Sequence, residues 1–131
     1  DVYSGRLKLK GEEHESTLRA ASNYAADFYD LRRFEEAKSV LRKTMPVARR
    51  VLRDEHVFTL QMRANYAMAL YKADSATLDD LREAKTSLEE TKRTAQRVLG
   101  GAYPLVAAIE EALGAARTAL RARKTPGPGD V

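Results

Sequence analysis

The stretch that decides the fold spans residues 13–29, which read EHESTLRAASNYAADFY. It returns at residues 55–71 as EHVFTLQMRANYAMALY. The two copies lie 42 residues apart, and Glu-His, Thr-Leu, Asn-Tyr-Ala and the final Tyr keep their places. Self-similarity at a fixed spacing of this size is typical of stacked helical repeats, so it predicts the architecture before any single helix is considered.

Apolar residues at spacings of three and four predict the helices around this repeat. They are expected at about residues 16–31, 34–52, 58–72, 78–99 and 105–122. The apolar stripe of the first consists of Leu18, Ala21, Tyr24, Ala25, Phe28 and Leu31. Residues 11–14 are predicted as a turn because they match residues 53–56. Residues 2–10, which precede this turn, would then be the end of an earlier helix, and the chain would have six helices. Pro46 predicts either a kink in the second helix or its early end.

The repeat also predicts how the chain is divided. Residues 1–124 form one helical repeat domain, in which residues 1–14 are the end of a preceding repeat or an N-terminal cap, 15–53 the first repeat, 54–100 the second repeat, and 101–124 a partial repeat or capping helix. Leu41 and Leu88 lie 47 residues apart, so the second repeat carries an insertion, which we place in its inter-helix turn. Residues 125–131 are rich in Pro and Gly and are predicted as a flexible tail.

Composition excludes several classes of protein. The 131 residues suffice for one small domain, and the abundance of Ala, Glu, Leu, Arg and Lys favours helix. There is no Cys, which excludes disulfides and thiolate metal sites and leads us to expect a cytoplasmic, intracellular location. The formal charge is +4, but basic residues alternate with acidic ones, which argues against nucleic acid as a partner. No apolar run is long enough for membrane insertion.

The residues that recur resemble a known family. Asn23-Tyr24-Ala25 with Phe28, followed by residues 34–37, Phe-Glu-Glu-Ala, and Leu41, resembles a tetratricopeptide repeat, and the 42-residue period is similar to the kinesin-light-chain type. The resemblance implies an all-α, right-handed superhelical solenoid of helix-turn-helix repeats. It also implies that a small residue of each first helix packs against one of the second, at Ala25 with Ala37 and at Ala67 with Ala84.

The same resemblance implies a partner-binding groove lined by the first helix of each repeat. In this chain, the groove positions would be Arg19, Ser22, Asn23, Ala26, Tyr29, Asp30, Gln61, Ala64, Asn65, Met68, Tyr71 and Lys72. An Asn amide both donates and accepts, which suits the backbone of an extended peptide, so Asn23 and Asn65 are the central candidates. Two interpretations stay open, since these amides could instead bond to a neighbouring helix. Tyr29 and Tyr71 could likewise stack on a ligand or simply pack.

Other candidate residues have structural explanations. His14 and His56 lie in equivalent turns with no acidic residues at metal-ligand spacing, so no metal site is predicted. A basic cluster on the second helix is either a solvated face or a contact for an acidic partner or nucleic acid; it consists of Arg42, Lys43, Arg49, Arg50 and Arg53. No catalytic arrangement and no phosphate-binding loop appears, so neither an enzyme nor a cofactor is expected.

These observations predict a protein-interaction scaffold that binds a peptide or partner protein in its groove without catalysis. The alternative is a structural subunit that self-associates as a homo-oligomer or packs within a larger complex. RNA binding ranks third, because helical repeats can read single strands, but regularly repeated base-reading side chains are missing from this sequence.

Overall fold

The computed structural model describes the backbone of residues 2–124 and the side chains of residues 15–123. Within these residues the chain is all-α, and it has five helices and no strand: α1 (Val2–Asp30), α2 (Phe34–Val51), α3 (Val57–Lys72), α4 (Leu78–Leu99) and α5 (Pro104–Lys124). The predicted tail at residues 125–131 lies outside the described residues.

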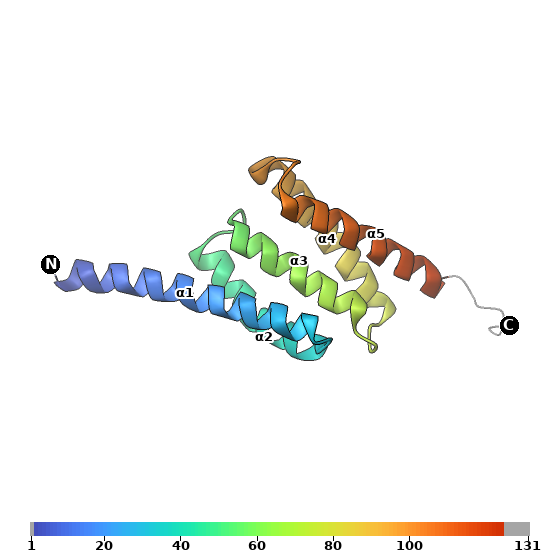
Figure 1. Ribbon diagram of the computed structural model, residues 1–131, viewed down its shortest axis with the longest axis horizontal. Coiled ribbons are helices and arrows are strands. Elements are labelled where there is room, and N and C mark those ends of the chain that lie inside the picture. Colours follow the sequence, from blue (N-terminus) through green and yellow to red (C-terminus); the bar gives the residue numbers. More distant parts are fainter. Residues whose placement is uncertain (1, 125–131) are drawn as a thin grey trace.

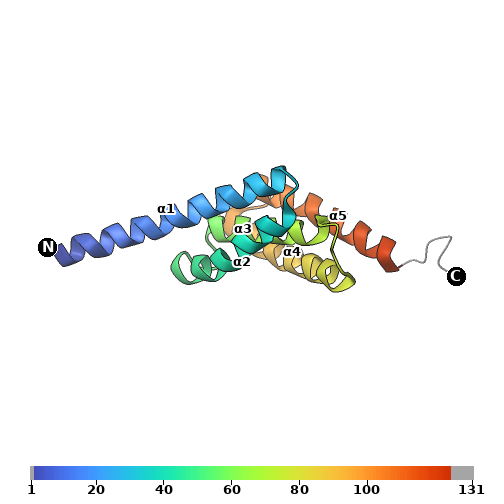
Figure 2. The same ribbon diagram turned by 90° about the horizontal axis from the view of Figure 1, so that it is seen from below.

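The helices form two layers. Each helix packs against the next along the chain, and α3 also contacts both α1 and α5. Helices α1, α3 and α5 therefore form one layer, and α2 and α4 form the other (Figures 1 and 2). Among the described residues, α2 and α4 do not contact each other, because α3 lies between them. This packing is consistent with a helical repeat.

Two apolar clusters hold the layers together, and α3 contributes to both. Leu18 and Ala25 of α1 pack with Leu41 of α2 and with Met62 of α3. A second cluster joins the other face of α3 to α4 and α5 through Ala67, Ala84, Leu88, Ile109 and Leu113. The four small residues predicted at the helix contacts are fully enclosed, since Ala25, Ala67 and Ala84 are 0% exposed and Ala37 is 1% exposed. Side chains of this size allow two helix backbones to approach closely.

The turn predicted at residues 11–14 is wrong, because α1 runs without a break from Val2 to Asp30. In the second copy the chain does break: Arg53 adopts a positive φ of 77°, and His56 caps α3 by accepting the N–H of Phe58 at Nδ1, at 3.1 Å. In the first copy, good helix formers flank Gly11, and a single interior glycine costs only about 1 kcal/mol. Residues 2–14 therefore extend α1 and are not the end of a separate helix (Figure 1).

Two residues of the apolar stripe predicted for the first helix are largely exposed. Tyr24 is 63% exposed and Leu31 is 66% exposed. Their counterparts 42 residues later are Tyr66, which packs against both apolar clusters, and Ala73, which is 7% exposed. The difference is positional: α3 lies between α2 and α4, whereas no other helix among residues 2–124 covers the outer side of α1.

The other helix boundaries follow from local chemistry. Thr77 and Asp80 form a capping box, with the Thr77 N–H donating to Asp80 at 3.0 Å and the Asp80 N–H donating to Thr77 at 3.1 Å. Helix α2 continues past Pro46 to Val51, so the alternative of an early end there is wrong. Gly100 ends α4 with a φ of 89°, a conformation that glycine adopts without steric cost.

The end of α1 places an arginine where a glycine is usual. The Arg33 N–H donates to the Phe28 carbonyl at 2.7 Å, and the Arg32 N–H donates to the Tyr29 carbonyl at 2.9 Å. These two bonds define a Schellman motif, in which the residue at Arg32 must be left-handed, and its φ is 60°. The Arg33 guanidinium lies 5.2 Å from the Phe28 ring and takes the place of the hydrophobic contact that often closes this motif.

We therefore expect Arg32→Gly to stabilise the protein by about 0.5–1 kcal/mol. The substitution removes the strain of a left-handed non-glycine residue, and this gain exceeds the cost of the conformational freedom that glycine adds to the unfolded chain. Urea unfolding followed by circular dichroism measures this change. The matched control, Arg33→Gly, should destabilise the protein, since it loses the contact with Phe28 and the ion pair with Glu36. A loss of stability in Arg32→Gly would show that the contact of Arg32 with the Phe34 ring outweighs the strain.

Candidate functional site

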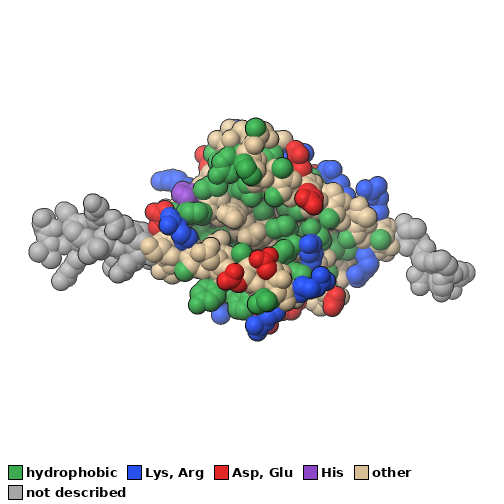
Figure 3. All heavy atoms as spheres, viewed as in Figure 1, with side chains coloured by type: hydrophobic (Ala, Val, Ile, Leu, Met, Phe, Trp, Pro, Cys, Tyr) green, Lys and Arg blue, Asp and Glu red, His purple; other side chains and the backbone are tan. Residues whose placement is uncertain are grey.

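The layer of α1, α3 and α5 presents a face with two adjoining hollows. Hydrophobic side chains gather along the middle of this face and charged ones lie around them (Figure 3). The hollow at the start of α3 and α5 measures about 590 Å³ and is lined by Val57, Gln61, Tyr103, Pro104, Leu105 and Ala108. The second measures about 270 Å³, and its lining includes Tyr29, Met68, Tyr71, Lys72, Glu111 and Ala108. Because Ala108 lines both, the hollows adjoin along α5.

The structure keeps most of the predicted groove residues on the surface. Arg19, Asn23, Asp30, Gln61 and Lys72 are exposed, and Ala26, Tyr29, Asn65, Met68 and Tyr71 are half-buried. Ser22 and Ala64 are 7% and 3% exposed, so the prediction that these two face a partner must be corrected. Ala64 belongs to the apolar cluster that α3 forms with α4 and α5, and Ser22 lies on α1, which contacts α2 and α3. Five of the predicted residues line the hollows: Gln61 lines the larger, and Tyr29, Met68, Tyr71 and Lys72 line the smaller.

Within residues 15–123, the two central asparagines have no hydrogen-bond partner for their side-chain amides. The side-chain hydrogen bonds formed among the described residues include neither Asn23 nor Asn65. The interpretation that these amides bond to a neighbouring helix therefore finds no support in residues 15–123. Arg19, in contrast, is already engaged, because it lies 3.6 Å from Glu15 and its guanidinium lies 5.1 Å from the Phe58 ring.

The tyrosines at the smaller hollow are partly packed and partly open. Tyr29 meets the Phe34 ring edge-on at 5.4 Å, and the Lys72 ammonium lies 5.0 Å from the centre of the Tyr29 ring. Tyr71 packs against the apolar cluster of α3, α4 and α5 and lines the hollow with its remaining surface. Burial, with smaller contributions from Tyr29 and Glu111, raises the pKa of Tyr71 to about 12. Its hydroxyl therefore stays neutral and can donate a hydrogen bond to a ligand at any physiological pH.

The raised pKa predicts how stability changes in alkali. An unfolded tyrosine ionises near pH 10, so between about pH 10 and 12 the unfolded chain loses a proton that folded Tyr71 keeps, and stability falls as the pH rises. Tyrosinate absorbance should show a component that titrates near pH 12. Tyr71→Phe should remove that component and flatten the fall in stability. If Tyr71→Phe leaves the late component unchanged, another tyrosine carries it.

Helix α5 contributes residues to this face that the sequence pattern did not identify. Leu105, Ala108 and Glu111 line the hollows, but the predicted groove stopped at the second repeat. The sequence did carry a signal for them, because the 47-residue spacing makes Ala108 equivalent to Gln61 and Ala115 equivalent to Met68. In the third unit, the position equivalent to Asn23 and Asn65 is Ala112, which is 4% exposed, so the asparagine pattern did not extend to α5.

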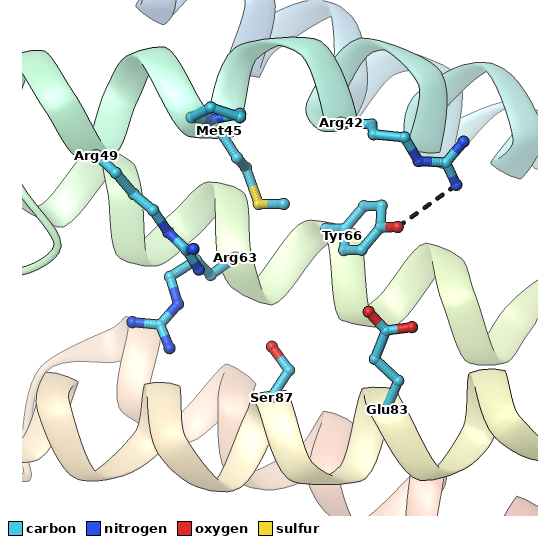
Figure 4. Close-up of a pocket in the computed structure, with 8 residues that line it drawn as sticks. Arg42, Met45, Arg49, Arg63, Tyr66, Glu83 and Ser87 are labelled. Carbon is cyan, nitrogen blue, oxygen red and sulfur yellow. Dashed lines mark hydrogen bonds between the residues drawn. The ribbon is translucent and has the colours of Figure 1, made fainter.

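The predicted basic cluster is divided by the structure. Arg42 and Arg49 line a further hollow between α2, α3 and α4, whereas Lys43, Arg50 and Arg53 are exposed outside it (Figure 4). The third arginine of that hollow, Arg63, comes from α3 and is not a member of the predicted basic cluster. The sequence did carry a signal for Arg63, because this charged residue stands at the position that the small residue Ala21 occupies in the first copy of the repeat.

Neither a metal site nor a membrane span is found in the part of the chain that the structure describes. No group of three His, Cys, Asp or Glu residues lies close enough together there to hold a metal ion. None of the described helices has the length and apolar character needed to cross a bilayer. Comparison with models of protein families, with curated proteins and with solved structures finds no match to this chain.

Proposed function

We propose that this chain is a non-catalytic interaction scaffold that binds an extended peptide, or an extended segment of a partner protein, across α1, α3 and α5. The observation that carries the proposal is the pair of adjoining hollows on one face of the layer that also carries Asn23 and Asn65, whose side-chain amides form no hydrogen bond within residues 15–123. The resemblance to tetratricopeptide repeats supports the same face, since first helices line the groove in that family.

The lining of the hollows indicates the chemistry of the ligand. Val57, Pro104 and Leu105 offer an apolar surface at one end, which favours a hydrophobic side chain of the peptide. At the other end, Lys72 and Glu111 lie on the rim beside the half-buried Tyr71. A peptide that places an apolar anchor in the larger hollow and polar residues along the smaller one would match both.

The test begins with selection of peptide ligands from a displayed library and measurement of their affinity by calorimetry. Asn23→Ala and Asn65→Ala should each weaken binding by about 1 kcal/mol, roughly fivefold, the usual effect of losing one hydrogen bond. Gln96→Ala is the matched control, because it removes an exposed amide from α4 in the opposite layer and should leave the affinity unchanged. A double Asn variant that binds as tightly as the parent would exclude this face.

A second candidate function is structural assembly, and one observation favours it. Tyr24 on α1 and Leu31 directly after it form an exposed apolar strip, whereas their counterparts Tyr66 and Ala73 are packed. A helix of a second copy could cover this strip, much as other helices cover α3. Sedimentation over a concentration series distinguishes the candidates: self-association that Tyr24→Lys abolishes supports assembly, and a monomer at all concentrations supports the peptide-binding scaffold.

A further inference from the structure

The hollow between α2, α3 and α4 lies apart from the face proposed for peptide binding. It measures about 330 Å³ and exists because α2 and α4 flank α3 without contacting each other. Arg42 and Arg49 reach it from α2, Arg63 and Tyr66 from α3, and Ser87 from α4 (Figure 4). Three elements thus bring three guanidinium groups and two hydroxyl groups to one place.

Arg63 is the unusual member of this group. Its side chain is only 11% exposed, and its Nε is buried with no hydrogen-bond partner among the described residues. Its ion-pair partner is Glu90, whose Oε2 lies 3.8 Å from Nη2, which is longer than a hydrogen bond. A buried guanidinium donor without an acceptor is costly, so this donor is available for an acceptor that no side chain of residues 15–123 supplies.

The surrounding charges are balanced but do not satisfy that donor. Arg49 lies 3.3 Å from Asp54, and Arg42 donates to the Tyr66 hydroxyl at 3.5 Å. Glu83 faces Arg42 and Tyr66 across the hollow (Figure 4). Burial lowers the pKa of Arg63 and the positive charge of Arg49 lowers it further, while the charges of Asp54 and Glu90 raise it by smaller amounts. An anion between the two guanidinium groups would relieve both lowering effects.

We propose that this hollow is a binding site for an oxyanion, a phosphate or carboxylate group on a small molecule, held by Arg63 and Arg49. The planar fork of Arg63 presents its Nε and one terminal nitrogen on the same edge, which matches two oxygens of one oxyanion. Ser87, opposite on α4, can donate a third hydrogen bond. Met45 and Tyr66 form an apolar wall against which the rest of the ligand packs.

The probes are inorganic phosphate and acetate, each titrated into the ¹⁵N-labelled full chain against sodium chloride at matched ionic strength. The Nε–H resonance of Arg63 should move saturably with at least one of them, and the Ser87 amide should move with it. A response to phosphate alone assigns the site to phosphate groups, and a response to both assigns it to oxyanions generally. Failure of both probes to move Arg63 beyond the chloride control would overturn the proposal.

Variants separate a built site from general attraction to a basic protein. Arg63→Met keeps much of the buried volume and should weaken binding at least about tenfold, since it removes the fork. Arg49→Gln should weaken binding about threefold or more, because it removes a positive charge. The Arg49 side chain is half-exposed, so this substitution carries little risk to folding. Arg50→Gln is the matched control, because it removes an equal charge from the next position outside the hollow. Equal weakening by Arg49→Gln and Arg50→Gln would overturn the site.

Discussion

Tyr66→Ala is expected to destabilise the protein by about 2–4 kcal/mol, whereas Tyr24→Ala should change its stability by less than about 0.5 kcal/mol. The two tyrosines occupy the same position in successive copies of the repeat, 42 residues apart. Tyr66 packs against both apolar clusters, so its removal leaves a gap between them. Tyr24 is 63% exposed and loses little on truncation.

Urea unfolding of the two variants and the parent, analysed with a shared slope, gives the difference directly. The pair controls for chemistry, since both substitutions remove the same ring from a helix that continues on either side. Similar losses in the two variants would mean that the outer side of α1 is covered in solution, which is the result that self-association through Tyr24 would give.

Ala84→Leu is expected to destabilise the protein by about 2–3 kcal/mol or to prevent its folding. Ala84 is 0% exposed where α4 packs against α3, and so is Ala67, its predicted partner. A leucine there would push the two helices apart, because a close-packed interior leaves no space for three further carbon atoms.

The matched control is Ala107→Leu on α5, which places the same side chain at an exposed position and should stay within about 0.5 kcal/mol of the parent. Differential scanning calorimetry measures both variants. A stable Ala84→Leu protein would show that α3 and α4 can separate at little cost, and the small residue would then not set their spacing.

Much of this architecture could be predicted from the sequence, because helix periodicity and the 42-residue repeat report on packing that recurs. The capping box of Thr77 and Asp80 and helices α2 to α5, to within one or two residues, follow from local rules, whereas the four alanines at the helix contacts were implied by the resemblance. Such rules require only neighbours in sequence, or an equivalent position in the other copy.

The errors arose where equivalent positions have different surroundings. Residues 11–14 match a real turn at residues 53–56, but a left-handed Arg53 and the His56 cap break the chain only in the second copy. Tyr24 matches a packed residue, yet only Tyr66 has a helix on either side. Sequence equivalence shows which residues play the same part and does not show whether the neighbour that covers them is present.

The candidate sites were predictable only in part, because each combines helices that are far apart in sequence. The resemblance identified Gln61, Met68 and Tyr71 on α3 but not the residues of α5 that complete the hollows. The basic cluster identified Arg42 and Arg49 on α2, but the buried donor beside them belongs to Arg63 on α3. Which side chains of separate helices meet is settled by packing, and no spacing within one helix reports it.

Backbone amide shifts of the ¹⁵N-labelled chain show whether the face of α1, α3 and α5 binds an extended peptide. On addition of a selected peptide, we expect the largest changes at Asn23, Gln61, Asn65, Met68 and Ala108, with little change in the amides of α2 and α4. Changes concentrated instead on α2 and α4, or on the outer side of α1 around Tyr24, would contradict binding at this face.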